Sequence, residues 1–220
     1  MGTITRSFAN NIGLSGILTA SAVTNTTVED VTSFDNAAST ATLVLLSTQT
    51  ASASANISFT TGLDSTYDEY IFKFINIHPA TDQTNFTFQV DTGTNTNYNQ
   101  TMTTTFFWSF HNEADTVTQL QYFATYDQGQ GTGFQNITEA IGNASDENSC
   151  GELSIFNPSS STYVKHFIAR TQTLEGTGYS TDSYTAGYIN TTTAITRVQF
   201  KMSSGNIDDG IIKLYGVKKS

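Results

Sequence analysis

Cysteine and proline are scarce in this sequence. One cysteine, Cys150, and two prolines occur among its 220 residues. A single cysteine excludes an intrachain disulfide, and it also excludes a zinc site of the cysteine-rich kind. We therefore expect the stability of the chain to come from packing or from contacts with partner chains.

Charged residues are also few, and most of them are acidic. They make up 13% of the chain, with 9 Lys and Arg against 19 Asp and Glu, for a formal net charge of -10. Proteins that bind nucleic acids present clustered Lys and Arg to the phosphates. The composition therefore predicts no nucleic-acid partner and a surface covered mainly by Thr, Ser, Asn and Gln.

Long hydrophobic runs are missing from the sequence. The first 22 residues contain no apolar run of signal-peptide length, and no later segment approaches the length of a membrane span. We expect neither Sec-dependent export nor membrane insertion. The Asn-x-Ser/Thr triplets, such as Asn56-Ile57-Ser58 and Asn136-Ile137-Thr138, then reflect richness in Asn and Thr rather than glycosylation.

What the chain does contain is a series of short segments typical of β-strands. Apolar and polar residues alternate in most of them, Gly, Asn, Asp and Ser separate them, and no segment shows helical spacing over helical length. The segments are 42–50, 55–63, 67–77, 85–92, 101–112, 119–127, 150–157, 162–173, 183–190, 194–204 and 210–218. This pattern predicts an all-β fold, an antiparallel β-sandwich of jelly-roll-like type, for residues 41–220.

The phase of the alternation predicts which side chains share a face. In the segment 67–77 one face carries Tyr70, Phe72 and Phe74, and the other carries Ile71, Lys73, Ile75 and Ile77. The last two segments place an apolar set opposite a polar set: Val198, Phe200, Met202, Ile212 and Leu214 against Arg197, Gln199, Lys201 and Lys213. These two segments form either a closing hairpin or two strands joined across the sandwich.

The C-terminal residues are expected to complete the domain. Gly216 ends the last strand, and Lys218 and Lys219 follow it. We expect these lysines to be solvated cations that keep the terminal edge from pairing with other strands, with contact to an acidic neighbouring subunit as the alternative.

Residues 1–40 are small, polar and aperiodic, with scattered apolar side chains. Such a segment is too polar for a core of its own and too apolar for a free linker. We predict an extended N-terminal arm for docking or oligomerisation, with a short helical turn at 26–34, attached to the sandwich of residues 41–220. The apolar residues expected to make its contacts include Ile4, Phe8, Ile12, Leu14 and Ile17.

Residues for catalysis or metal binding are sparse. The histidines, His78, His111 and His166, lie far apart in the sequence, and 129–134 is a glycine-rich bend without a following helix, expected to be a flexible loop. The acidic groups Asp64, Asp68-Glu69, Asp146-Glu147 and Asp208-Asp209 fall at predicted turns, where Asp is favoured for local hydrogen bonding. A calcium site or a glycosidase pair is the alternative for these carboxylates, but we expect no enzyme activity, no metal and no cofactor.

Aromatic residues are the clearest candidates for interaction. Phe106, Phe107, Trp108 and Phe110 lie in one predicted strand and Tyr122, Phe123 and Tyr126 follow soon after, so rings occur on both faces of a sheet. Rings on an outer face bury between identical subunits or stack on sugar rings. We select Phe107, Trp108 and Tyr122 as interaction residues and favour the subunit interface, because a monomer would otherwise expose too much apolar surface.

Two segments also resemble a known group of proteins. They are "LVLLSTQTASASANISFTTGLDSTYDEYIFKFINIHPATD" at 43–82 and "SSGNIDDGIIKLYGVK" at 203–218; the opening "MGTITRSFANNIGLSG" is similar as well. Together they resemble small β-rich virion proteins of tailed bacteriophages, notably those of marine and freshwater bacteria. Members of this group occur as capsid decoration proteins, head fibres and tail-fibre tips.

The resemblance implies a homo-oligomer, often a trimer, on the surface of the particle. The partners it implies are further copies of the chain and other virion proteins of the capsid or tail, and it transfers no catalytic residues. The protein would be made in the host cytoplasm and located on the virion. We therefore expect a virion structural protein anchored by its N-terminal arm. The alternative is a lectin-like fibre tip that binds a polysaccharide of the host surface and serves host attachment.

Overall fold

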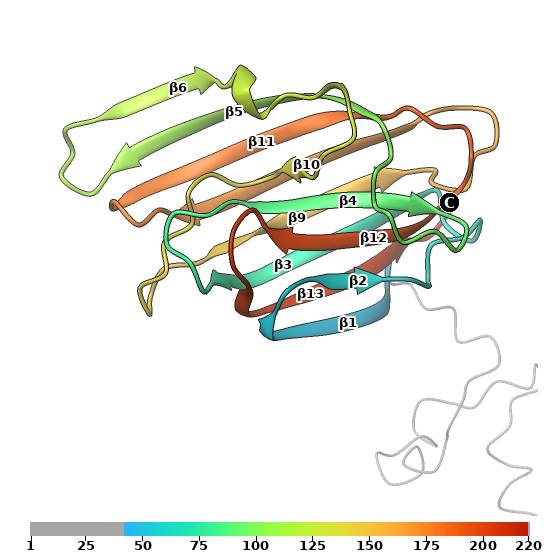
Figure 1. Cartoon of the computed structure of the whole chain (residues 1–220), viewed down its shortest axis with the longest axis horizontal. Coiled ribbons are helices and arrows are strands. Elements are labelled where there is room, and N and C mark those ends of the chain that lie inside the picture. The colour runs from blue at the N-terminus through green and yellow to red at the C-terminus, as the bar shows by residue number, and fades with distance from the viewer. Residues whose placement is uncertain (1–41, 220) are drawn as a thin grey trace, which may run out of the picture. The chain divides into compact units, whose positions relative to one another are not determined.

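Two antiparallel β-sheets pack against each other in the computed structural model, which describes residues 42–219 (Figure 1). The order of the large sheet is β1-β13-β3-β9-β10-β11-β5-β6, with β7 also paired to β5, and the order of the small sheet is β2-β12-β4-β8. The large sheet consists of β1 (Leu43–Ser54), β3 (Glu69–Pro79), β5 (Met102–Asn112), β6 (Thr118–Tyr122), β7 (Gly129–Gly131), β9 (Ser149–Phe156), β10 (Lys165–Leu174), β11 (Tyr179–Ile189) and β13 (Ile207–Val217). The small sheet consists of β2 (Ile57–Phe59), β4 (Phe86–Thr92), β8 (Gln135–Asn136) and β12 (Ile195–Met202). The predicted all-β sandwich is confirmed.

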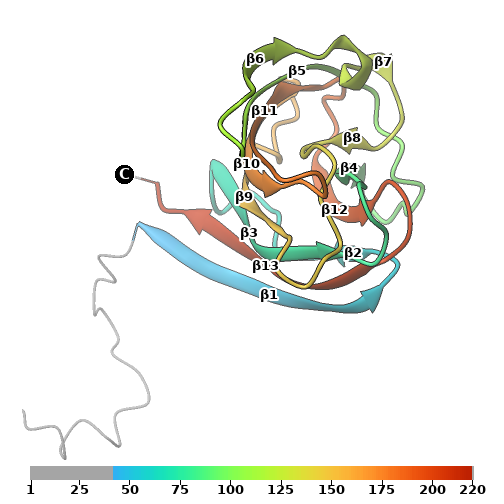
Figure 2. The ribbon, with the colours of Figure 1, turned by 90° about the vertical axis from the view of Figure 1, so that its left-hand side faces the viewer.

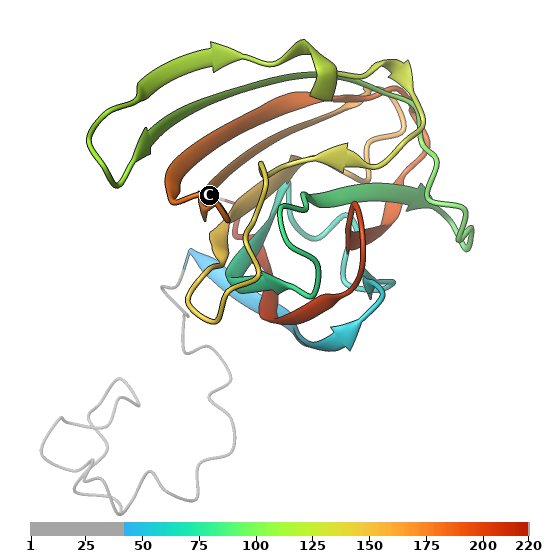
Figure 3. The same cartoon turned by 60° about the vertical axis from the view of Figure 1, so that its left-hand side comes forward.

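The large sheet curves around the small one. Figure 2 shows β1, β13 and β3 below the small sheet, β9 and β10 beside it, and β11, β5 and β6 above it. Figure 3, from another side, shows the long strands of the upper part reaching beyond the small sheet. The face of the large sheet that turns toward the small sheet is called the inner face below, and the opposite face is called the outer face.

A cluster of phenylalanine rings forms the core at the β3 side of the sandwich. Phe72 and Phe74 point inward from β3 and meet Phe200 of β12, with ring centroids 5.2 and 5.3 Å apart. Phe59 of β2 and Phe86 of β4 pack on the same ring of Phe200, at 6.2 and 5.6 Å. Two of these rings belong to the large sheet and three to the small sheet, so the cluster holds the two sheets together.

The inner face of β10, β11 and β5 carries buried threonines among its apolar side chains. A segment that begins at β8 and runs to Ile141 lies over it and receives hydrogen bonds from threonine side chains of the sheet. Thr171 Oγ1 donates to the Ile137 carbonyl at 2.5 Å, and Thr104 Oγ1 donates to Gln135 Oε1 at 2.8 Å. Both threonines are buried, so these bonds satisfy backbone and amide groups that water does not reach.

The predicted phase holds for most of β3 and fails at its end. Tyr70, Phe72 and Phe74 are buried, but Ile77 joins them on the inner face, contrary to the prediction. The cause is a β-bulge between Phe74 and Ile77, where Asn76 has a φ of 52°. The partner strand β13 matches it with Gly210 at a φ of 136°, where a side chain would meet the Asn76 carbonyl oxygen at 3.0 Å.

Four further local predictions are decided by the fold. The last two strands are joined across the sandwich, because β12 belongs to the small sheet and β13 to the large one. Asp208 and Asp209 lie within β13 rather than in a turn, and the glycine-rich bend forms the short strand β7. The segment 119–127 divides into β6 and a 3-10 turn, η2 (Ala124–Tyr126), rather than one strand.

The predicted arm of residues 1–40, with its helical turn and its residues Ile4, Phe8, Ile12, Leu14 and Ile17, lies outside the described residues. Within 42–219, no helix is long and apolar enough to cross a membrane.

Candidate functional site

The three aromatic residues selected from the sequence lie on two faces of the large sheet. Phe107 of β5 is 38% exposed and Tyr122 at the end of β6 is 57% exposed, whereas Trp108 is only 7% exposed. Successive residues of a strand point to opposite faces, so the ring of Trp108 lies on the inner face when that of Phe107 lies on the outer face. The expectation that Trp108 is a surface ring is therefore corrected.

The outer face carries a row of paired side chains that crosses six strands. Each member sits directly opposite the next in the strand register. This outer row consists of Lys73, Glu152, Arg170, Tyr184, Phe107 and Tyr122. Cross-strand neighbours of this kind contact one another through their side chains, so the row divides into a charged part and an aromatic part.

The side chains of the outer row contact one another and Asp182 through ion pairs and ring stacking. Arg170 donates two hydrogen bonds to Asp182, at 3.0 and 2.7 Å, and its guanidinium lies 5.0 Å from the ring centre of Tyr184. The rings of Tyr184 and Phe107 stack at 4.9 Å with an interplanar angle of 3°. Lys73 pairs with Glu152. Shallow hollows lie along and beside the row. The charged groups of the row have partners within the chain, and its aromatic part is exposed at Phe107 and Tyr122.

A separate hollow lies on the inner side of β5 and β11. It is lined by Trp108, Phe110, Glu139, Glu175 and Tyr179, and its volume is about 180 Å³. Trp108 and Phe110 come from β5, Tyr179 from the start of β11, and the two glutamates from the loops that cover this part of the sheet. We call these five residues the inner pocket.

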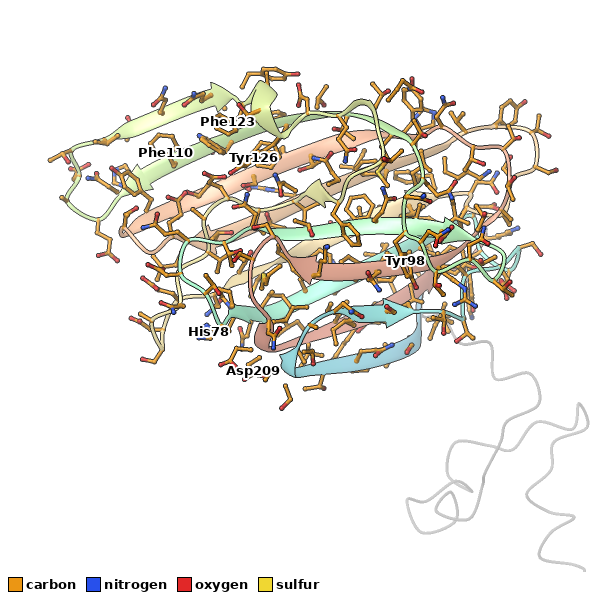
Figure 4. The ribbon with its side chains drawn as sticks, in the orientation of Figure 1. His78, Tyr98, Phe110, Phe123, Tyr126 and Asp209 are labelled. Carbon is orange, nitrogen blue, oxygen red and sulfur yellow. The ribbon has the colours of Figure 1, made fainter. Side chains whose placement is uncertain are left out.

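Further rings hold the tryptophan of the inner pocket in place. The ring of Phe123 stacks on Trp108 at 4.4 Å, and Tyr126 of η2 packs edge-on against Phe123 at 4.7 Å. Figure 4 shows Phe110, Phe123 and Tyr126 gathered at the same end of the molecule, beside β5 and β6. The ring of Phe110 meets Tyr179 at 5.5 Å. One wall of the pocket is thus built from rings whose positions are set by other rings.

Burial changes the acidity of the groups beside these rings. It raises the pKa of Glu139 to about 7; the charge of Glu175 acts in the same direction, and a hydrogen bond with Tyr126 opposes the rise. Burial likewise raises the pKa of Glu175, although Thr181 donates a hydrogen bond to this carboxylate. The pKa of the Tyr126 hydroxyl is raised by burial and by the neighbouring Glu139. Near neutral pH the pocket therefore takes up or releases a proton at Glu139.

Two polar atoms of the inner pocket have no hydrogen-bond partner. Trp108 Nε1 and Glu139 Oε2 are both buried, and neither atom makes a hydrogen bond with a described residue. Native proteins satisfy nearly all buried polar atoms, and each exception requires an explanation. One of these atoms can only donate, and the other accepts when the carboxyl group is ionised.

The other groups considered for chemistry remain scattered. Within residues 42–219, no three His, Cys, Asp or Glu side chains are arranged to hold a metal ion. His78 and Asp209 lie opposite each other in the register of β3 and β13, away from Phe110, Phe123 and Tyr126 (Figure 4). His111 contacts Asp115. Asp64 accepts a hydrogen bond from the Thr66 amide, as the turn prediction requires.

The C-terminal lysine has a partner in its own chain. Lys219 Nζ lies 2.9 Å from a carboxylate oxygen of Asp68 and 3.2 Å from the Ser65 carbonyl oxygen. The Lys218 amide donates to the Thr42 carbonyl at 2.9 Å, which joins the two ends of the described chain beside β1. Lys219 is exposed, as expected for a solvated cation, and it also pairs with a carboxylate of its own chain.

Comparison with known proteins identifies no similar protein. No protein-family model matches the chain, and no curated protein or solved structure matches it significantly.

The sequence pointed to Trp108 and Phe110 of the inner pocket, but not to Tyr179 or to the two carboxylates. Glu139 and Glu175 lie in loops, and neither belongs to the acidic pairs that the sequence places at predicted turns. No pattern in the sequence places either one near Trp108, because 31 residues separate Trp108 from Glu139 and 67 separate it from Glu175. Only the pairing of Ile141 with Glu175 and the path of the segment from β8 bring them together.

Proposed function

We propose that this chain is a surface protein of a tailed-phage virion, in which residues 1–40 attach the protein and the β-sandwich is displayed. The observation that carries this proposal is the position of the two segments that resemble virion proteins. They contain β1, β2, β3 and β13, and three of these strands are neighbours at one edge of the large sheet, in the order β1-β13-β3. The resemblance thus falls on one continuous part of the fold rather than on unrelated pieces.

The arrangement of the strands supports display from this edge. Residues 1–40 join the sandwich just before β1, the first strand in the order of the large sheet, and β6 is the last. The aromatic part of the outer row lies on β11, β5 and β6, toward that last strand. An attachment at the β1 edge would therefore leave the aromatic end free for contacts.

The outer face suits contact with further copies of the chain. Six of its large apolar side chains are at least about one-third exposed: Ile75, Phe107, Leu120, Tyr122, Phe156 and Ile168. Apolar groups gathered on one face of a soluble domain mark a contact surface more often than scattered ones do. We assign this face to the interface between subunits, or between the subunit and a neighbouring virion protein.

Removal of residues 1–40 tests the attachment. The chain 41–220 is expected to remain a folded domain with a circular-dichroism spectrum typical of β-sheet, and to be absent from purified particles when it is supplied in place of the full chain. The full-length chain supplied in the same way is the control, and immunoblotting of the particles is the readout. Normal incorporation of the truncated chain would show that the attachment lies in the sandwich.

A second candidate function is recognition of a host surface polysaccharide. The inner pocket favours it, because aromatic walls next to a carboxylate and an indole N–H suit a hydroxyl-rich ring. A protein that only decorates the particle would have no need of such a pocket. The two functions are compatible, since a displayed module can also bind a receptor.

A further inference from the structure

We infer that the inner pocket binds a single pyranose residue of a glycan. This inference deepens the second candidate function and relies on it only for the biological source of the sugar. Binding itself is a property of the isolated chain and is tested without any virion.

The size of the pocket limits the ligand to one ring. Its volume of about 180 Å³ is below the roughly 300 Å³ at which pockets for drug-sized ligands begin. A single six-membered ring is of the right order, whereas several linked sugars would have to extend outside. The ligand is therefore an end residue or one residue of a longer chain.

The walls of the pocket match the two kinds of surface that a pyranose offers. Trp108, Phe110 and Tyr179 supply apolar faces for the C–H side of the ring. Trp108 is more than nine-tenths buried and its Nε1 has no partner in the described chain, so this N–H requires an acceptor. Glu139 Oε2 requires a partner as well. Hydroxyl groups can both accept a hydrogen bond and donate one, and a sugar ring presents several of them side by side.

A quaternary ammonium ion is the strongest competing ligand. Rings and carboxylates attract such cations through the ring faces and the negative charge. However, a quaternary ammonium group accepts no hydrogen bond, so Trp108 Nε1 would stay unpaired in the complex, at a cost that buried donors usually avoid. The pair of unsatisfied atoms therefore favours the sugar.

Intrinsic fluorescence gives a direct readout, because Trp108 is the only tryptophan in the chain. The full-length protein is titrated with the methyl glycosides of glucose, galactose, mannose and N-acetylglucosamine, and in parallel with tetramethylammonium. We expect a saturable change in fluorescence with at least one glycoside and none with tetramethylammonium. Saturation by tetramethylammonium alone, or by no probe up to 50 mM glycoside, a concentration on the order of ten times a weak millimolar Kd, would overturn the inference.

Two conservative variants locate the binding. Glu139→Gln removes the charged acceptor and Trp108→Phe removes the N–H but keeps a ring; each is expected to weaken binding of the active glycoside about tenfold or more, measured by calorimetry. Tyr163→Ser is the control, since Tyr163 is a 71% exposed ring outside the pocket. Circular dichroism verifies that each variant is folded. Unchanged affinity in both pocket variants would place the sugar elsewhere and overturn the inference. Particle incorporation is scored separately, so loss of the pocket and loss of the virion role are distinguishable.

Discussion

The two ends of the large sheet are built differently on their inner faces. At the β3 end, phenylalanine rings from both sheets meet one another around Phe200, and the core is apolar. At the β5 end, buried threonines hydrogen-bond to a covering segment, and a hollow remains between rings and carboxylates. The first arrangement closes the sandwich, and the second leaves polar atoms that lack partners. The difference separates the part of the fold that provides stability from the part that is available for binding.

The largest effect on stability is expected in the phenylalanine cluster. Phe200→Ala should lower the free energy of unfolding by about 3–5 kcal/mol, because it leaves a cavity among rings that have little freedom to collapse. Phe110→Ala removes the same side chain from the wall of the inner pocket, where the ring is only partly buried, and should cost less than half as much. Urea denaturation of both variants measures the contrast, and equal losses would mean that the two ends do not differ as described.

A smaller effect is expected for the hydrogen bonds at the β5 end. Thr171→Val keeps the shape of the side chain but leaves the Ile137 carbonyl without its donor, so it should cost about 1–3 kcal/mol. Thr48→Val, at an exposed position of β1, is the control and should change the free energy of unfolding by less than about 0.5 kcal/mol. Similar changes in the free energy of unfolding for both variants would show that the hydrogen bond from Thr171 does not stabilise the covering segment.

The pKa of Glu139 predicts a pH-dependent effect on thermal stability. Burial raises this pKa from 4.5 to about 7, so the folded state holds a proton that the unfolded state releases, and stability is lost as pH rises from about 4.5 to 7. Glu139→Gln removes this loss. The variant should therefore have a higher Tm than the parent at pH 8 and a similar Tm at pH 4, measured by calorimetry.

Neighbouring groups act on the same equilibrium. The hydrogen bond with Tyr126 opposes the rise in the pKa of Glu139, and the charge of Glu175 adds to this rise. In a Glu175→Gln background, the difference in Tm at pH 8 that Glu139→Gln causes is therefore expected to be smaller. A Tm difference between parent and Glu139→Gln that is the same at pH 4 and pH 8 would contradict the assignment.

The smallest effect on the stability of one subunit is expected on the outer face. Leu120→Ser alters a side chain that is 72% exposed, so the free energy of unfolding should change by less than about 0.5 kcal/mol. If copies of the chain meet through this face, the same change should lower the mass observed in sedimentation. Tyr163→Ser changes an equally exposed ring in the β9–β10 loop and should leave the mass unaltered. A mass that Leu120→Ser leaves unaltered would remove this face from the interface.

The sequence predicts the fold class well because alternation records burial on one face of a strand. Tyr70, Phe72 and Phe74 are buried as their phase requires. Local exceptions depend on partners elsewhere: Ile77 turns inward because of a bulge opposite Gly210, and Lys165 is fully buried because its ammonium group donates to the Thr191 and Thr193 carbonyls. Neither contact has a signature within its own strand.

The candidate site is less accessible to sequence reasoning than the fold. Both faces of the strand around Phe107 and Trp108 carry rings. Alternation then shows that the two side chains point to opposite faces, but it does not show which of the two faces the core. Glu139 and Glu175 belong to loops that have no periodicity. The pocket exists only because distant segments cross the same part of the sheet, and that crossing is a tertiary property.

Amide hydrogen exchange of the full chain, with and without a saturating methyl glycoside, tests most directly whether the two ends have separate roles. The account predicts slower exchange in β5, in η2 and in the segment 135–141 when the sugar is bound, and no change in β1, β3 and β13. Slower exchange confined to β1, β3 and β13, or no change anywhere, would contradict it.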